Sequence, residues 1–142
     1  PKLTINQSIL VSLSAEDSRL VDMPNGGELS ITRSLLGQGP KSVNGQLIGY
    51  GLEGMSKLKN SINLVENVIY LERLGANYML TTPKGIDLDS LIQKNNIIIG
   101  NDNSSYKSSD NTYFIDRTEL GVPPYPKLPN TYCRTWSYCP IK

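Results

Sequence analysis

The chain has 142 residues, a length at which one domain can bury its own hydrophobic core. Its 14 basic and 13 acidic residues leave no basic excess for nucleic acid, and no apolar run approaches the roughly 18 residues of a membrane span. Histidine is absent, which excludes the usual Ser-His-Asp and Cys-His catalytic groups and any zinc site that needs imidazole. We therefore expect no metal and no cofactor.

The first third of the chain has the pattern of strands and a tight turn. Apolar residues share one parity over residues 3–13, with only Gln7 breaking the set, which predicts a single strand with one buried face. The sequence PNGG at 24–27 is a strong turn signal, because Asn and Gly adopt positive φ at little cost. Alternating residues on both sides of it predict a β-hairpin over 19–35.

Residues 55–71 have the spacing of an amphipathic helix. Apolar residues recur at intervals of three and four, namely Met55, Leu58, Ile62, Val65 and Ile69. The spacing predicts one helix packed on a sheet. An alternative remains, because the β-branched residues near Val68 and Ile69 also fit a hairpin in which VIYLER pairs with YMLTT.

The second half of the chain alternates short apolar segments with polar loops. IDLDSLIQ fits a short helix, NNIIIG a buried strand and TYFIDR a further strand. The segment 101–111 is rich in turn-forming residues, and its Asp102, Asn103 and Asp110 could offer oxygen ligands to calcium. The segment lacks the residue spacing of an EF-hand, so we expect a solvated loop.

Both cysteines of the chain, Cys133 and Cys139, lie in its last ten residues. Five residues separate them, whereas a redox pair of the thioredoxin type has two. We expect a local disulfide that closes a small ring at the end of the chain. Disulfides persist in oxidising compartments, so this pair predicts an extracytoplasmic location: secreted, periplasmic, or on a cell or virion surface.

One stretch points to a different class of protein. LVENVIYLERLGANYMLTTPKGIDL resembles the end of a winged-helix domain, with a helix closing on Leu-Glu-x-Leu-Gly and a short wing after it. The resemblance covers about 25 residues and implies duplex DNA as the partner. The segment before it departs from the pattern, because IGYGLEG has too many glycines for a supporting helix.

Together these features predict a single β-rich α+β domain over 1–142. An antiparallel sheet would carry one packed helix, and 119–142 would form an extended tail closed by Cys133–Cys139; an all-β sandwich is the alternative fold. Tyrosine, tryptophan and arginine dominate binding hot spots. The tail supplies the candidate ligand-binding residues Tyr125, Tyr132, Arg134, Trp136 and Tyr138.

We expect a non-catalytic extracytoplasmic binding or assembly module, such as an adhesin, a surface-appendage subunit or a receptor-binding domain. Its partner would be a protein or glycan on a cell surface, or sister subunits, with no nucleic acid and no membrane insertion. Three further classes remain open: a periplasmic sensor or accessory domain that binds another protein, a winged-helix DNA-binding domain, and a glycan hydrolase. A hydrolase would need two of the carboxylates at Asp87, Asp89, Asp102, Asp110, Asp116 and Glu119.

Overall fold

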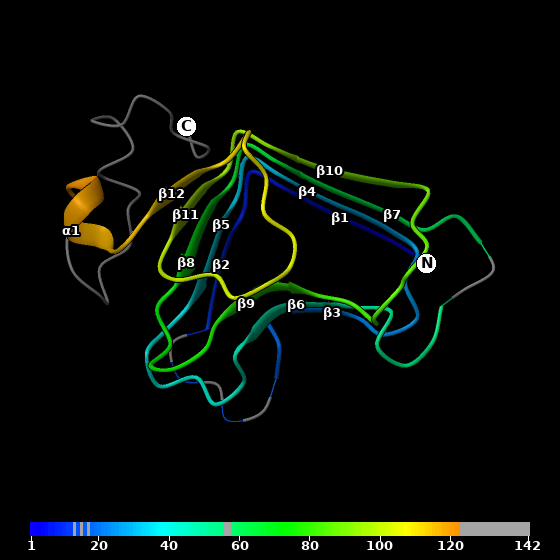
Figure 1. The fold of residues 1–142 in the computed structure, drawn as a ribbon, viewed down its shortest axis with the longest axis horizontal. Helices are drawn as coiled ribbons and strands as arrows, with labels where there is room; N and C mark the ends of the chain where they lie inside the picture. The colour runs from blue at the N-terminus through cyan, green and yellow to red at the C-terminus, as the bar shows by residue number, and fades with distance from the viewer. Residues whose placement is uncertain (13, 15, 17, 56–57, 123–142) are drawn as a thin grey trace.

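The protein is a parallel β-solenoid, seen here in a computed structural model. The structure describes residues 1–12, 14, 16, 18–55 and 58–122. The chain visits three parallel sheets in turn, so each coil forms one layer of a three-sided stack (Figure 1). A four-residue helix, α1 (Arg117–Leu120), follows the last strand. Within the described ranges, no helix has the length and apolar character that a membrane span requires.

The three sheets differ in their number of strands. Sheet A contains β1 (Lys2–Asn6), β4 (Glu28–Thr32), β7 (Ser61–Val65) and β10 (Ser90–Lys94). Sheet B contains β2 (Ile9–Ser12), β5 (Leu35–Gln38), β8 (Val68–Leu71), β11 (Ile97–Ile99) and β12 (Thr112–Phe114). Sheet C contains β3 (Val21–Met23), β6 (Gln46–Tyr50) and β9 (Tyr78–Thr81). The fourth coil therefore has strands in sheets A and B but, among the described residues, none in sheet C.

The core fills the space between the three sheets. Along β4, Leu29 and Ile31 are buried while the alternating residues are half-buried, which is the period-two pattern of a strand with one inner face. The same alternation in β7 buries Ile62 and Leu64 at the same level of the stack, since Leu29 pairs with Ile62 and Ile31 with Leu64. Each coil thus places its apolar residues on those of the coil below.

The corner between sheets A and B has a repeated geometry. One residue at each corner adopts positive φ, and these residues are Gln7 (48°), Arg33 (47°), Glu66 (60°) and Asn95 (55°). The left-handed conformation is uncommon for a residue other than glycine, and here it turns the chain from one strand into the next. The number of residues between sheets A and B is also the same in every coil. One row of paired residues in sheet A consists of Lys2, Glu28, Ser61 and Ser90. The residues seven positions after each of these pair with one another in sheet B.

A ladder of buried polar side chains joins these corners. Its members, called the polar ladder below, are Ser34, Asn67, Asn96 and Asn111, and Ser34 Oγ accepts from the Ser8 N–H of the first coil. The backbone N–H of Asn67 donates to Oδ1 of Asn96 at 2.9 Å, and the backbone N–H of Asn96 donates to Oδ1 of Asn111 at 3.2 Å. Each side chain therefore satisfies a buried main-chain group of a neighbouring coil, which buried polar groups require.

The outer face of sheet B is apolar. Leu35, Val68 and Ile97 occupy one column of this face, and together with Tyr70 and Ile99 they form a second buried cluster. Helix α1 lies against it, with the Arg117 guanidinium 4.3 Å from the centre of the Tyr70 ring and paired with the Glu72 carboxylate. Arg117 is only 8% exposed, so this cation–π contact and ion pair fix the helix on the sheet.

The predicted antiparallel α+β fold is wrong, because every strand pair among the described residues is parallel. The all-β alternative is closer, although the protein is a solenoid and not a sandwich. The predicted strand over 3–13 is in fact two strands, β1 and β2, with a corner at Gln7, the residue that broke the alternation.

The predicted hairpin over 19–35 is also wrong. Its two arms contain β3 and β4, but these belong to sheets C and A and do not pair. The PNGG turn is present as a corner, with positive φ at Gly26 (72°) and Gly27 (112°). A turn signal reports that the chain changes direction but does not specify which strand it pairs with.

The predicted helix over 55–71 is replaced by β7 and β8, and the alternative hairpin fails because β8 and β9 lie in different sheets. Ile62 and Ile69 point to the core from two strands separated by the corner at Glu66. That corner shifts the parity of the second strand and produces apparent helical spacing. The expected short helix at IDLDSLIQ is likewise replaced by β10, whereas the buried strand in NNIIIG is confirmed as β11.

The predicted Cys133–Cys139 disulfide is corrected as well. No disulfide was found among the described residues, and Cys133 and Cys139 both lie outside them. The first residues of the predicted extended tail, 119 and 120, instead close helix α1. The sequence argument for an oxidising compartment rested mainly on this pair, and the described residues add no support to it.

Candidate functional site: a groove at the open edge of sheet C

The missing fourth strand of sheet C leaves β9 as an edge strand. Residues 101–111, called the cap segment below, cross the end of the solenoid instead (Figure 1). At the β9 side, Asn103 N–H donates to the Asn77 carbonyl oxygen at 2.7 Å, and the Met79 N–H donates to Asp102 Oδ1 at 3.0 Å. At the β10 side, Gln93 Nε2 donates to the Tyr106 carbonyl oxygen at 3.2 Å. The cap segment therefore covers part of the exposed edge.

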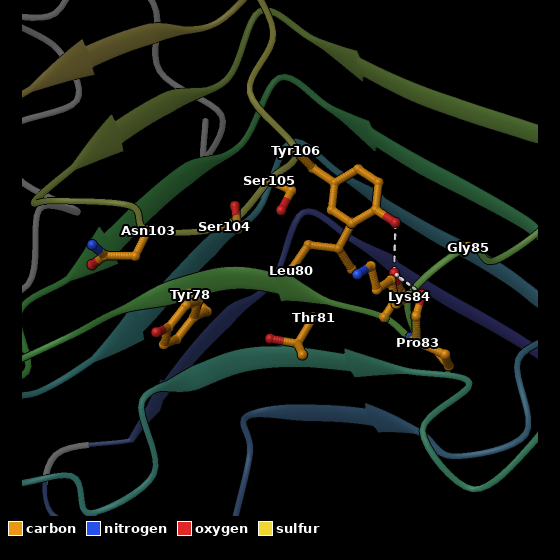
Figure 2. A pocket seen from close by; sticks show the side chains of 11 residues that line it. Tyr78, Leu80, Thr81, Pro83, Lys84, Gly85, Asn103, Ser104, Ser105 and Tyr106 are labelled. Carbon is orange, nitrogen blue, oxygen red and sulfur yellow. Dashed lines mark hydrogen bonds between the residues drawn. The ribbon is translucent and has the colours of Figure 1, made fainter.

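A groove with a volume of about 400 Å³ lies where the cap segment diverges from β9. The turn after β9 forms one wall and the middle of the cap segment forms the other (Figure 2). Its lining is mostly hydroxyl, amide and aromatic, and comprises Tyr78, Leu80, Thr81, Thr82, Pro83, Lys84, Gly85, Asn103, Ser104, Ser105 and Tyr106.

Two tyrosines define the groove. Tyr106 is held in place because its hydroxyl is hydrogen-bonded to Thr82 Oγ1 at 2.5 Å, across the two walls. The Tyr106 ring also packs against the main core, so it is a fixed surface and not a free side chain. Tyr78 is 37% exposed and lies on the strand side of the groove (Figure 2). A ligand in the groove would thus meet one fixed and one accessible aromatic ring.

The electrostatic character of the groove comes from one cation. Lys84 is the single charged residue in the lining, and its side chain extends toward the space beneath Tyr106 (Figure 2). Within the part of the chain that the structure describes, no carboxylate pairs with Lys84, and none of the lining residues is Asp or Glu. The groove therefore favours neutral or anionic ligands over cationic ones.

The groove also holds an unsatisfied hydroxyl. Thr81 Oγ1 is buried and has no hydrogen-bond partner among the described residues. Leaving such a group unpaired costs about 1–3 kcal/mol. A change of rotamer could direct this hydroxyl to a ligand, because Thr81 lines the groove and threonine has more than one accessible staggered state.

Two of the three sequence-predicted calcium ligands, Asp102 and Asn103, have structural roles instead, and the third, Asp110, is exposed. The Asp102 carboxylate accepts hydrogen bonds from the Met79 N–H, the Ser104 N–H and the Ser104 hydroxyl, and Asp102 is 3% exposed. Oδ1 of Asn103 accepts from the Asn77 N–H. Among the described residues, no group of three or more acidic or metal-ligating side chains could hold an ion. The prediction of a loop at 101–111 is correct.

Several carboxylates considered for a hydrolase also serve the backbone. Asp89 accepts from the Asn60 N–H, Asp116 caps helix α1 by accepting from the Glu119 N–H, and Glu119 accepts from the Ile115 N–H. The predicted ligand-binding residues of the tail lie outside the described residues: Tyr125, Tyr132, Arg134, Trp136 and Tyr138.

Sequence reasoning did not identify the groove. Tyr78 and Lys84 come from the β9 region, whereas Tyr106 comes from the cap segment more than 20 residues later. A usable signal was the tyrosine content, eight against one phenylalanine, because it indicates rings with a wet edge. The chain matches no protein-family model, and comparisons with curated proteins and with solved structures gave no match.

Proposed function

We propose that the protein is a non-catalytic binding module that holds a glycan in the groove between β9 and the cap segment. One observation carries the proposal: the groove combines two tyrosine rings with several hydroxyl and amide groups and no carboxylate in its described lining. The apolar faces of a sugar ring can pack on tyrosine, while its hydroxyls need many short-range hydrogen-bond partners. Thr82, Ser104 and Ser105 supply such partners.

The composition of the groove argues against a glycan hydrolase. Retaining and inverting glycosidases of the usual kind both place two carboxyl groups on either side of the bond that is cleaved. The described lining of this groove offers a lysine and hydroxyls instead. Binding without cleavage is therefore the better match to its chemistry.

The winged-helix and sensor interpretations lose support for separate reasons. A winged-helix domain needs a helix within 55–71, where the chain forms β7 and β8. A sensor or accessory domain has no feature of its own among the described residues. A glycan ligand agrees with the extracytoplasmic location expected from the sequence, since glycans are displayed there, but that location now rests on the ligand alone.

A glycan array followed by titration calorimetry tests the proposal. Aromatic contacts contribute about 0.5–1.5 kcal/mol beyond area burial, so we expect Tyr78→Ala to weaken glycan binding about tenfold. The matched control is Ile9→Ala, which removes an apolar side chain of similar exposure, 40%, from β2, the strand of sheet B at the opposite end of the stack. No binding by the wild-type protein to any glycan, or equal losses in both variants, would refute the proposal.

A further inference from the structure

We propose that the ligand is an anionic glycan chain, which extends from the groove across the cap segment to Lys107 and Lys94. This inference rests on the proposed glycan-binding function. Its basis is the arrangement of hollows around the cap segment. Besides the groove, a second hollow of about 480 Å³ borders β12, and a third of about 420 Å³ borders β10.

The groove and the third hollow are lined by consecutive residues of the cap segment. Tyr106 lines the groove, and the next residue, Lys107, lines the other two hollows. Successive Cα atoms are about 3.8 Å apart, so these side chains project from adjacent points of one backbone. A chain-like ligand that leaves the groove at Tyr106 therefore meets Lys107 first and Lys94 next.

The charges along this path are mainly positive. Lys84 lies in the groove, and Lys94 and Lys107 line the third hollow. No described carboxylate forms an ion pair with any of the three. Of the two acids that line the second and third hollows, Asp102 is buried and hydrogen-bonded, and Asp110 is exposed. Asp110 would repel an anionic ligand, but the three lysines would each attract it. The path as a whole therefore still favours an anion.

The third hollow is also suited to sugar rings. Leu91 and Ile92 line it and are 37% and 47% exposed. Leu91 is in register with the core residue Ile62 at the uncovered end of the stack, whereas Ile92 is in register with Asn63 on the outer face of sheet A. Apolar contacts of this kind resemble those that the tyrosines offer in the groove. A glycan with a carboxylate on each sugar unit could place its carboxylates at the lysine ammonium groups and its ring faces on the apolar side chains between them.

The test uses β-1,4-linked glucuronate oligomers and cello-oligosaccharides of the same length. They differ in that each carboxylate is replaced by a hydroxymethyl group, so the comparison isolates charge. We expect the glucuronates to bind more tightly, with a longer oligomer bound more tightly than the disaccharide. At roughly 0.2–1 kcal/mol for an exposed charge pair, Lys94→Gln and Lys107→Gln should each weaken the longer oligomer up to about fivefold and leave the disaccharide unchanged.

Lys84→Gln should weaken both glucuronate lengths, since Lys84 lies in the groove itself. The matched control is Lys2→Gln, which removes the same charge from the first strand of sheet A, at the opposite end of the solenoid, and should change neither affinity.

The outcomes separate the two proposals. Equal binding of charged and uncharged oligomers would overturn the anionic ligand but leave the glycan-binding function standing. Binding of glucuronates without dependence on length or on Lys94 and Lys107 would overturn the extended path. If neither series binds, or if a single-stranded oligonucleotide binds more tightly than any glucuronate, the anionic-glycan inference is overturned. If no glycan on the array binds, both this inference and the proposed glycan-binding function are overturned.

Discussion

The polar ladder predicts a large effect from a single buried amide. The Asn67 side chain is fully buried, accepts a hydrogen bond from the Ser34 N–H at 3.0 Å and donates one to the Ile31 carbonyl oxygen at 2.8 Å. Asn67→Ala removes both hydrogen bonds and leaves the buried Ser34 N–H without a partner. At about 1–3 kcal/mol for that group and about 1 kcal/mol for the lost bond to Ile31, we expect the free energy of unfolding to fall by roughly 2–4 kcal/mol.

Such a loss is large beside the roughly 5–15 kcal/mol that is typical of a whole domain. Urea unfolding measures it as a lower midpoint at an unchanged slope. The matched control is Asn63→Ala in the same strand-turn unit, because Asn63 is half exposed and its side chain donates only to Ser30 Oγ at 3.1 Å. We expect that change to cost less than about 1 kcal/mol. Equal costs for the two variants would show that the ladder does not stabilise the solenoid.

Two further predictions concern the interior. Burial raises the pKa of Tyr70 to about 12 from 10.0, so between these pH values the unfolded chain releases this proton and the folded one keeps it. The free energy of unfolding should therefore fall by roughly 2–3 kcal/mol between pH 10 and 12. The urea midpoint of Tyr70→Phe should decline less over the same pH range, because phenylalanine does not titrate. Equal declines in the wild-type protein and the variant would contradict this account. Gly100→Ala should destabilise the protein by more than about 2 kcal/mol, since a Cβ there would lie 2.1 Å from the Leu71 carbonyl oxygen. Gly54→Ala, also at positive φ but with open space around it, should cost less in thermal unfolding, and equal midpoints would refute the steric argument.

A repeat is present in the sequence, although its period varies. Lys2 pairs with Glu28, Glu28 with Ser61 and Ser61 with Ser90, so successive coils advance by 26, 33 and 29 residues. A search for one fixed period cannot find this repeat. The constant part is the segment that spans sheet A, the corner and sheet B, at 2–12, 28–38, 61–71 and 90–100. The variation lies in the loops on the other two sides.

The local pattern was sufficient for some of the single strands and turns. Three consecutive isoleucines between polar residues predicted β11, and the turn formers of PNGG and of the cap segment predicted changes of direction. These features follow from side-chain sterics and backbone freedom within a few residues. The helical spacing around Ile62 and Ile69 misled the prediction, because a corner between two strands can produce the same intervals.

The tertiary structure alone decided which strands pair and where the groove lies. Parallel pairing joins residues about 30 positions apart, so neither the direction nor the register of the sheets is encoded in a local pattern. The groove exists because the fourth coil omits its strand in sheet C and sends Tyr106 across the end of the stack, opposite Lys84. The sequence supplied the tyrosines and the lysines, and stacking of the coils brought them together.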